Sequence, residues 1–67
     1  MTDAKYPYIE VELSGQDGNA LFIMGSVAKA MRRAGINEDE IDTYRAEAMG
    51  GDYDNLLRVT MTFVNVT

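Results

Sequence analysis

The longest helical period in the chain lies between Asn19 and Gly35, and it constrains the fold more than any other feature. Apolar side chains recur there three or four residues apart: Ala20, Ile23, Met24, Val27, Met31 and Ala34. At about 100° per residue, this spacing places them on one stripe of an α-helix. Asp17 or Asn19 is suited to cap the start of the helix, and Gly35 to end it. We therefore expect the rest of this short chain to pack on the stripe.

A tight corner to a second helix is predicted directly after Gly35. Ile36 is expected to be buried against Met31, as the apolar contact of a Schellman motif. Asn37 is expected to cap the second helix, and Glu40, three residues later, to complete a capping box. We expect the second helix to run from about Glu38 to Met49, with these residues inward: Ile41, Tyr44 and Ala48.

The two ends of the chain are predicted to form a small sheet. Residues 1–7 are expected to be a frayed lead, and apolar and polar residues then alternate from Tyr8 to Leu13, as in a half-buried strand. The tail fits both periods. We favour a helix from about Tyr53 to Met61 or Thr62, aligning Leu56, Leu57 and Met61, followed by a strand from Val64 to Val66 that pairs with the first strand. The predicted fold class is α+β: one domain over residues 1–67, β-α-α-α-β, with a two-stranded antiparallel sheet packed on helices.

Composition argues against most catalytic chemistry. The 67 residues include no Cys and no His, which removes thiolate nucleophiles, imidazole acid–base catalysis and the common zinc sites. No stretch approaches the roughly 18 to 20 apolar residues of a membrane span. We therefore expect a non-enzymatic cytoplasmic protein without a cofactor or metal, and we assign the methionines to an irregular core rather than to a binding groove.

Acidic residues outnumber basic ones by eleven to six, and the excess is local. Between Glu38 and Asp54, seven acids accompany a single base, Arg45. Direct binding of nucleic acid is therefore not expected. The acids fit either a solvated face with helix-start carboxylates, or a surface that presents carboxylates in place of phosphates to a nucleic-acid-binding protein. The candidate partner-binding residues are Glu38, Asp39, Asp42, Glu47, Asp52 and Asp54.

Short motifs along nearly the whole chain carry a resemblance to a known group of proteins. They are Ser14-Gly15 with Asp17-Gly18-Asn19-Ala20, Arg32-Arg33-Ala34-Gly35, Glu40-Ile41-Asp42, Glu47-Ala48, and Gly51-Asp52-Tyr53-Asp54 with Leu56-Leu57. In these motifs the chain resembles short proteins encoded by bacteriophages and by phage-derived elements of bacterial genomes.

The resemblance implies a function that the residue patterns alone do not. It implies an inhibitor of a bacterial defence system of the anti-CRISPR type, acting in the host cytoplasm on a CRISPR effector complex, in some cases as a DNA mimic. The alternative is a small structural or regulatory protein-interaction module, with a homodimer as one form. Binding that weakens with salt would favour the mimic, whereas an apolar dimer interface would persist at high salt.

Overall fold

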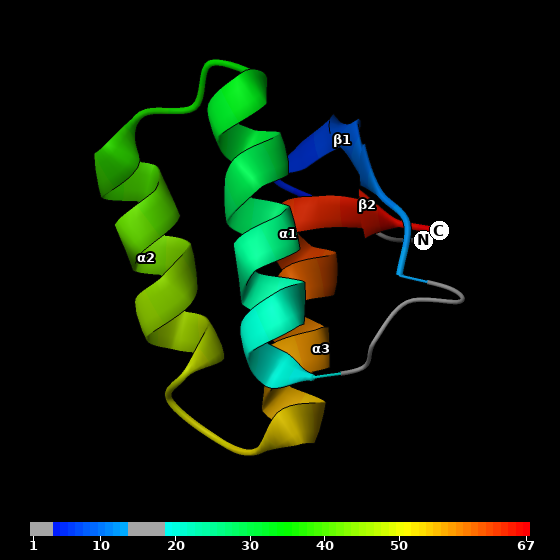
Figure 1. Ribbon diagram of the computed structural model, residues 1–67, viewed down its shortest axis with the longest axis vertical. Coiled ribbons are helices and arrows are strands. Elements are labelled where there is room, and N and C mark those ends of the chain that lie inside the picture. The colour runs from blue at the N-terminus through cyan, green and yellow to red at the C-terminus, as the bar shows by residue number, and fades with distance from the viewer. Residues whose placement is uncertain (1–3, 14–18) are drawn as a thin grey trace.

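A computed structural model of the protein describes residues 4–13 and 19–67. Its elements are β1 (Tyr6–Val11), α1 (Ala20–Arg33), α2 (Glu38–Ala48), α3 (Tyr53–Phe63) and β2 (Val64–Val66). This is the predicted β-α-α-α-β order of an α+β fold. In Figure 1, α2 lies on the outside of α1, on the side away from the two strands. Among the described residues, no helix is long and apolar enough to span a bilayer.

β1 and β2 pair with each other and run parallel, which joins segments from the two ends of the chain (Figure 1). The predicted pairing is confirmed, but the predicted antiparallel direction is wrong. Antiparallel strands are often joined by a short hairpin, whereas parallel strands need a long crossover that usually contains a helix. Three helices form the connection here, and they return β2 to the side of β1 in the same direction.

β1 begins earlier than the predicted strand from Tyr8 to Leu13. It pairs with β2 from Tyr6 onward, and the backbone N–H of Lys5 donates to the C=O of Thr62 at 2.8 Å. The expectation of a frayed lead is therefore wrong for residues 5–7, while residues 1–3 lie outside the described part. The register is irregular after Tyr6, where Pro7 has no N–H to contribute to the ladder.

Side-chain N-caps are present on all three helices, and those of α1 and α2 are at predicted positions. The side-chain oxygen of Asn19 accepts from the N–H of Leu21 at 2.8 Å, and Asn37 and Asp52 cap α2 and α3 in the same way. These bonds satisfy backbone donors that have no partner inside the helix. Asp17, the other candidate cap for α1, lies outside the described residues.

The corner between α1 and α2 has the predicted Schellman geometry. Gly35 has a φ of +88°, and the N–H of Ile36 donates to the C=O of Met31 at 3.0 Å. A glycine fits this left-handed position because it has no Cβ to clash with the backbone. Ile36 packs against the core but is only partly buried, so its predicted full burial is wrong.

One cluster of buried apolar side chains from all five elements forms the core. The predicted inward residues of α2 are all buried, as are most of the α1 stripe: Ile23, Met24, Val27 and Met31. Ala34, at the end of that stripe, is exposed. Val64 places the start of β2 in the same cluster, with none of its surface exposed.

The buried face of α3 overlaps the predicted one only in part. Leu56 is buried and Leu57 packs half-buried against the core, as predicted, but Met61 is exposed, and Thr60 and Phe63 are buried in addition. Met49, at the end of α2, is exposed as well, so the assignment of the methionines to the core holds for Met24 and Met31 only. A threonine is accommodated inside because its hydroxyl is hydrogen-bonded there, as buried polar groups require.

Candidate functional site

α2 is the most acidic element, and it lies at the side of the molecule. Its eleven residues include five acids and one base, and it packs mainly on α1 and α3. The six predicted partner-binding residues are all exposed: Glu38, Asp39, Asp42, Glu47, Asp52 and Asp54. Their carboxylates are therefore available to a partner. Which of them share a surface depends on where each lies around α2 and at the start of α3.

One flank of α2 carries acids and bases together, next to α1. Glu38 accepts two hydrogen bonds from the Arg32 guanidinium, at 2.8 and 3.2 Å. These bonds lower the pKa of the Glu38 carboxyl, and the same contact raises the pKa of Arg32. Arg45 also lowers the pKa of Glu38, and Asp42 also raises the pKa of Arg32. The four charged groups are therefore close neighbours.

The opposite flank of α2 meets the start of β1. The carboxylate of Glu40 accepts from the Lys5 ammonium and, at 2.7 Å, from the Tyr6 hydroxyl. These two bonds lower the pKa of Glu40 and raise the pKa values of Lys5 and Tyr6. The predicted capping box is therefore wrong in its second half, because the Glu40 carboxylate binds β1 instead of the start of its own helix. Glu47 lies on the same flank, near enough to contribute to the raised pKa of Lys5.

The remaining predicted residues lie between or beyond these flanks. Asp39 is on the outer side of α2, one residue along from the flank with Glu38. Asp52 is used as the cap of α3, and Asp54 lies in the first turn of that helix. The six carboxylates thus surround the exposed side of α2 and extend to the start of α3, and they do not converge on one point.

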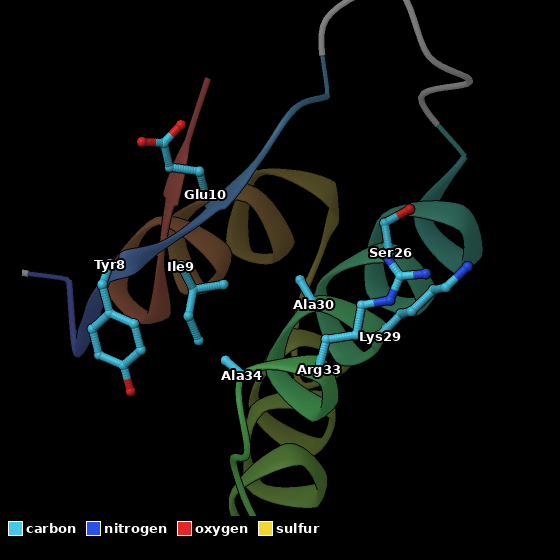
Figure 2. Close-up of a pocket in the computed structure, with 8 residues that line it drawn as sticks. All are labelled: Tyr8, Ile9, Glu10, Ser26, Lys29, Ala30, Arg33 and Ala34. Carbon is cyan, nitrogen blue, oxygen red and sulfur yellow. The ribbon is translucent and has the colours of Figure 1, made fainter.

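A groove of about 470 Å³ lies between β1 and α1, on the side of β1 away from β2. We call it the β1–α1 groove; it is lined by Tyr8 to Glu10 of β1 and by Ser26, Lys29, Ala30, Arg33 and Ala34 of α1. Figure 2 shows Ile9 pointing from β1 toward Ala30 and Ala34, whereas Glu10 points away from α1. Tyr8 is 67% exposed at the rim. The groove combines an apolar floor with two cations from α1.

A second hollow, of about 300 Å³, lies where α1 begins, α2 ends and α3 begins. Its floor includes Met24, Ala48 and Leu56, and Met49 and Tyr53 line it too. Leu21, in the same turn of α1, is 74% exposed, and Met49 is 66% exposed. We call this surface the helix-end patch: Met24, Met49 and Tyr53, which line the hollow, together with exposed Leu21, about one helical turn from Met24. Exposed apolar side chains of this size are a feature of protein interaction sites.

Sequence reasoning did not identify these two surfaces. Lys29 and Arg33 lie in the last turns of α1, where the helix dipole alone favours cations, and the groove they line exists only because β1 packs beside that flank of α1. For the helix-end patch, the signal is present in Leu21, which falls off the apolar stripe of α1 and is exposed.

No group of residues in the described part of the chain is arranged to hold a metal ion. Asp52 is engaged as the cap of α3. Searches against protein-family models, curated proteins and solved structures found no match for this chain. The proposals below therefore depend on the residues themselves.

Proposed function

We propose that the protein is a non-enzymatic inhibitor that binds a nucleic-acid-binding complex of a bacterial defence system, of the anti-CRISPR type. The observation that supports the proposal is the concentration of exposed carboxylates on α2. A helix that carries four exposed acids gives a protein of net charge −5 a surface complementary to a cationic groove. The partner class follows from chemistry, since grooves that bind phosphates are lined by Lys and Arg.

The outer side of α2 is the part of this surface best suited to contact. Asp39, on the outer side, and Asp42, between that side and the flank with Glu38, form no ion pair with any described residue, and both are exposed. Glu38 is held by Arg32, so it contributes less net charge to a partner. We therefore assign the central contacts to Asp39 and Asp42, with Glu47, Asp52 and Asp54 at the periphery.

The experiment compares two charge-matched variants in a phage survival assay. Asp39→Lys with Asp42→Lys changes the outer side of α2, and Glu10→Lys with Glu12→Lys changes the exposed face of the first strand by the same net charge. The proposal expects the α2 variant to lose protection of phage from an active CRISPR system and the strand variant to keep it. Equal protection by both variants, or no protection by the parent, would contradict the proposal.

A salt titration of the complex gives an independent measurement. If α2 replaces nucleic acid in a cationic groove, affinity for the isolated effector complex should fall steeply as salt rises from about 0.05 to 0.5 M, because exposed charges are screened over about 10 Å at 0.1 M. Binding that is unchanged over this range would rule out the mimic mechanism, even if inhibition were observed.

The helix-end patch favours a second candidate, a small interaction module that forms a homodimer. Leu21 and Met49 are both large apolar side chains that are mostly exposed, as at surfaces that bind another protein. Leu21→Lys should then convert a dimer to a monomer in sedimentation velocity, and the parent dimer should persist in 0.5 M salt. A parent protein that is monomeric at about 100 μM would exclude this candidate.

A further inference from the structure

We propose that the β1–α1 groove is a docking site for an extended acidic peptide segment of a partner protein, which adds to the sheet as a third strand beside β1. This inference concerns a different face from α2 and does not depend on the proposed inhibitor function. Three observations support it: the free edge of β1, the shape of the groove and the charges on its rim.

The edge of β1 that borders the groove has backbone groups available for a new strand. The C=O of Val11 accepts from the N–H of Thr67 at 3.0 Å, and the N–H of Leu13 donates to the C=O of Thr67 at 3.1 Å. These groups therefore point toward β2. Since successive residues of a strand point their backbone groups to opposite edges, the N–H and C=O of Glu10 face away from β2. Among the described residues, β2 is the only strand paired with β1.

The groove has a lining that suits an extended peptide. It is bounded by β1 on one side and by α1 on the other. When a peptide adds to a sheet edge in such a groove, main-chain hydrogen bonds provide affinity and side-chain pockets provide specificity. Its floor is made of small or apolar side chains, Ile9, Ala30 and Ala34, which leave room for alternate side chains of the peptide (Figure 2). Tyr8 at the rim supplies a large exposed ring of the type that anchors interfaces.

The charges on the rim specify the peptide. Lys5 and Arg32 form ion pairs with Glu40 and Glu38, whereas Lys29 and Arg33 form none with any described residue. These two cations are one helical turn apart, which separates them by about 6 Å along the axis. Alternate residues of a strand are about 6.8 Å apart, so carboxylates on alternate positions of the peptide match the two cations. Glu10 does not neutralise them, because it points to the other side of β1 (Figure 2).

The test uses a fluorescein-labelled peptide of alternating valine and glutamate, with glutamine replacing glutamate in a control peptide. Fluorescence anisotropy should show binding of the glutamate peptide to the parent and at least tenfold weaker binding of the glutamine peptide. Lys29→Glu with Arg33→Glu should weaken binding of the glutamate peptide at least tenfold. The control is Arg45→Glu with Arg58→Glu, on other surfaces. Each reversal lowers the net charge by two, so both double variants have a net charge of −9 against −5 in the parent. The control variant should change binding of the glutamate peptide less than threefold.

Backbone pairing is tested separately. Glu10→Pro removes the N–H on the free edge and should abolish binding, while the ladder with β2 uses neighbouring residues. If that variant fails to fold, amide hydrogen exchange of the parent gives the same information: the peptide should slow exchange at Glu10 and leave α2 unchanged.

Several results would overturn the proposal. Equal losses in both double variants would indicate general repulsion of an acidic peptide rather than a site. Protection of amides elsewhere than Tyr8 to Glu10 would place the peptide on another surface. A parent protein that forms dimers through β1, detected as dimers lost in Glu10→Pro, would show that a second copy occupies the edge instead.

Discussion

The tightest local constraint in the core is a buried hydrogen bond between α2 and α3. The hydroxyls of Tyr44 and Thr60 are 2.7 Å apart, and neither residue exposes any surface. Thr60 also donates to the C=O of Leu56 at 2.8 Å, which makes the Tyr44 hydroxyl the donor to Thr60. The Tyr44 ring packs edge-on against Phe63, with centroids 5.4 Å apart. Burial raises the pKa of Tyr44, as expected for a hydroxyl held in its neutral form.

Removing the Thr60 hydroxyl should therefore destabilise the fold more than removing that of Tyr44. Thr60→Val leaves the Tyr44 hydroxyl buried without a partner, which costs about 1 to 3 kcal/mol. Tyr44→Phe leaves Thr60 bonded to Leu56 and should cost about 0.5 to 1.5 kcal/mol. Urea unfolding of both variants and of the double variant measures the coupling. Thr62→Val, on the exposed side of α3, is the control, and a cost equal to that of Thr60→Val would contradict the assignment.

Two glycines of the α1 region give opposite predictions for the same substitution. A Cβ added at Gly25 or at Gly35 meets no atom within 4 Å, so neither change creates a clash with other groups. Gly25 is inside α1, where alanine is favoured by about 0.5 to 1 kcal/mol. Gly35 has a φ of +88°, where a Cβ costs about 1 to 2 kcal/mol. Thermal unfolding should show a higher midpoint for Gly25→Ala and a lower one for Gly35→Ala; midpoints shifted in the same direction would refute the corner geometry.

At the scale of elements, the ends of the helices could be predicted from sequence and the partners of the elements could not. Asn37 and Gly35 act on backbone groups within a few residues of themselves, so the local sequence contains the whole signal. Glu40 satisfies the capping-box pattern too, yet its carboxylate binds Lys5 and Tyr6. Those partners are distant in the chain and appear only once β1 is docked.

The errors in the strands and in α3 have the same origin. Alternation from Tyr8 to Leu13 predicts which side chains point inward, but the pattern is identical for parallel and antiparallel neighbours. In α3 the predicted stripe includes Met61 and omits Thr60, because a threonine counts as polar in the sequence pattern. The burial of Thr60 depends on the Tyr44 hydroxyl, which comes from another helix. The β1–α1 groove is likewise a product of tertiary packing.

The hydrogen bonds that join Glu40 of α2 to the start of β1 predict that the stability of the fold depends on pH. The bonds from Lys5 and Tyr6 lower the pKa of Glu40, so the folded state binds this proton less readily than the unfolded state. The contribution of Glu40 to the stability of the fold is therefore fully present above its ordinary pKa of 4.5. It is lost as pH falls through the lower pKa that Glu40 has in the folded state. The hydrogen bonds from Arg32 lower the pKa of Glu38, so Glu38 also stabilises the fold more at neutral pH than in acid.

Glu40→Gln should remove part of this dependence. The parent should lose stability between about pH 5 and 3, and the variant should show a flatter profile over that range. Urea midpoints measured at half-unit steps of pH test the difference, with Asp39→Gln as the control on the outer side of α2. A profile for Glu40→Gln that parallels the parent would show that the link to β1 contributes nothing in solution.

At the scale of the whole molecule, the fold is closed by the pairing of the two ends of its chain. β1 has no other strand partner in the described residues, and a strand without one leaves backbone groups to water. A 67-residue chain buries only about 60% of its unfolded surface, so its margin of stability is small. Val64 is completely buried, which ties β2 to the core as well as to β1.

A chain shortened to end at Phe63 should therefore lose cooperative unfolding altogether. It lacks the ladder to β1 and the buried Val64 side chain, whose removal leaves a cavity in a small core. Val66→Ala is the control, because it keeps both the backbone of β2 and the Val64 side chain and removes only a partly buried side chain. Circular dichroism at 222 nm should show a broad, shallow melt for the shortened chain and a sharp transition for Val66→Ala. A single sharp transition in the shortened chain would mean that the three helices and β1 form a stable unit by themselves, and that β2 is not needed to close the fold.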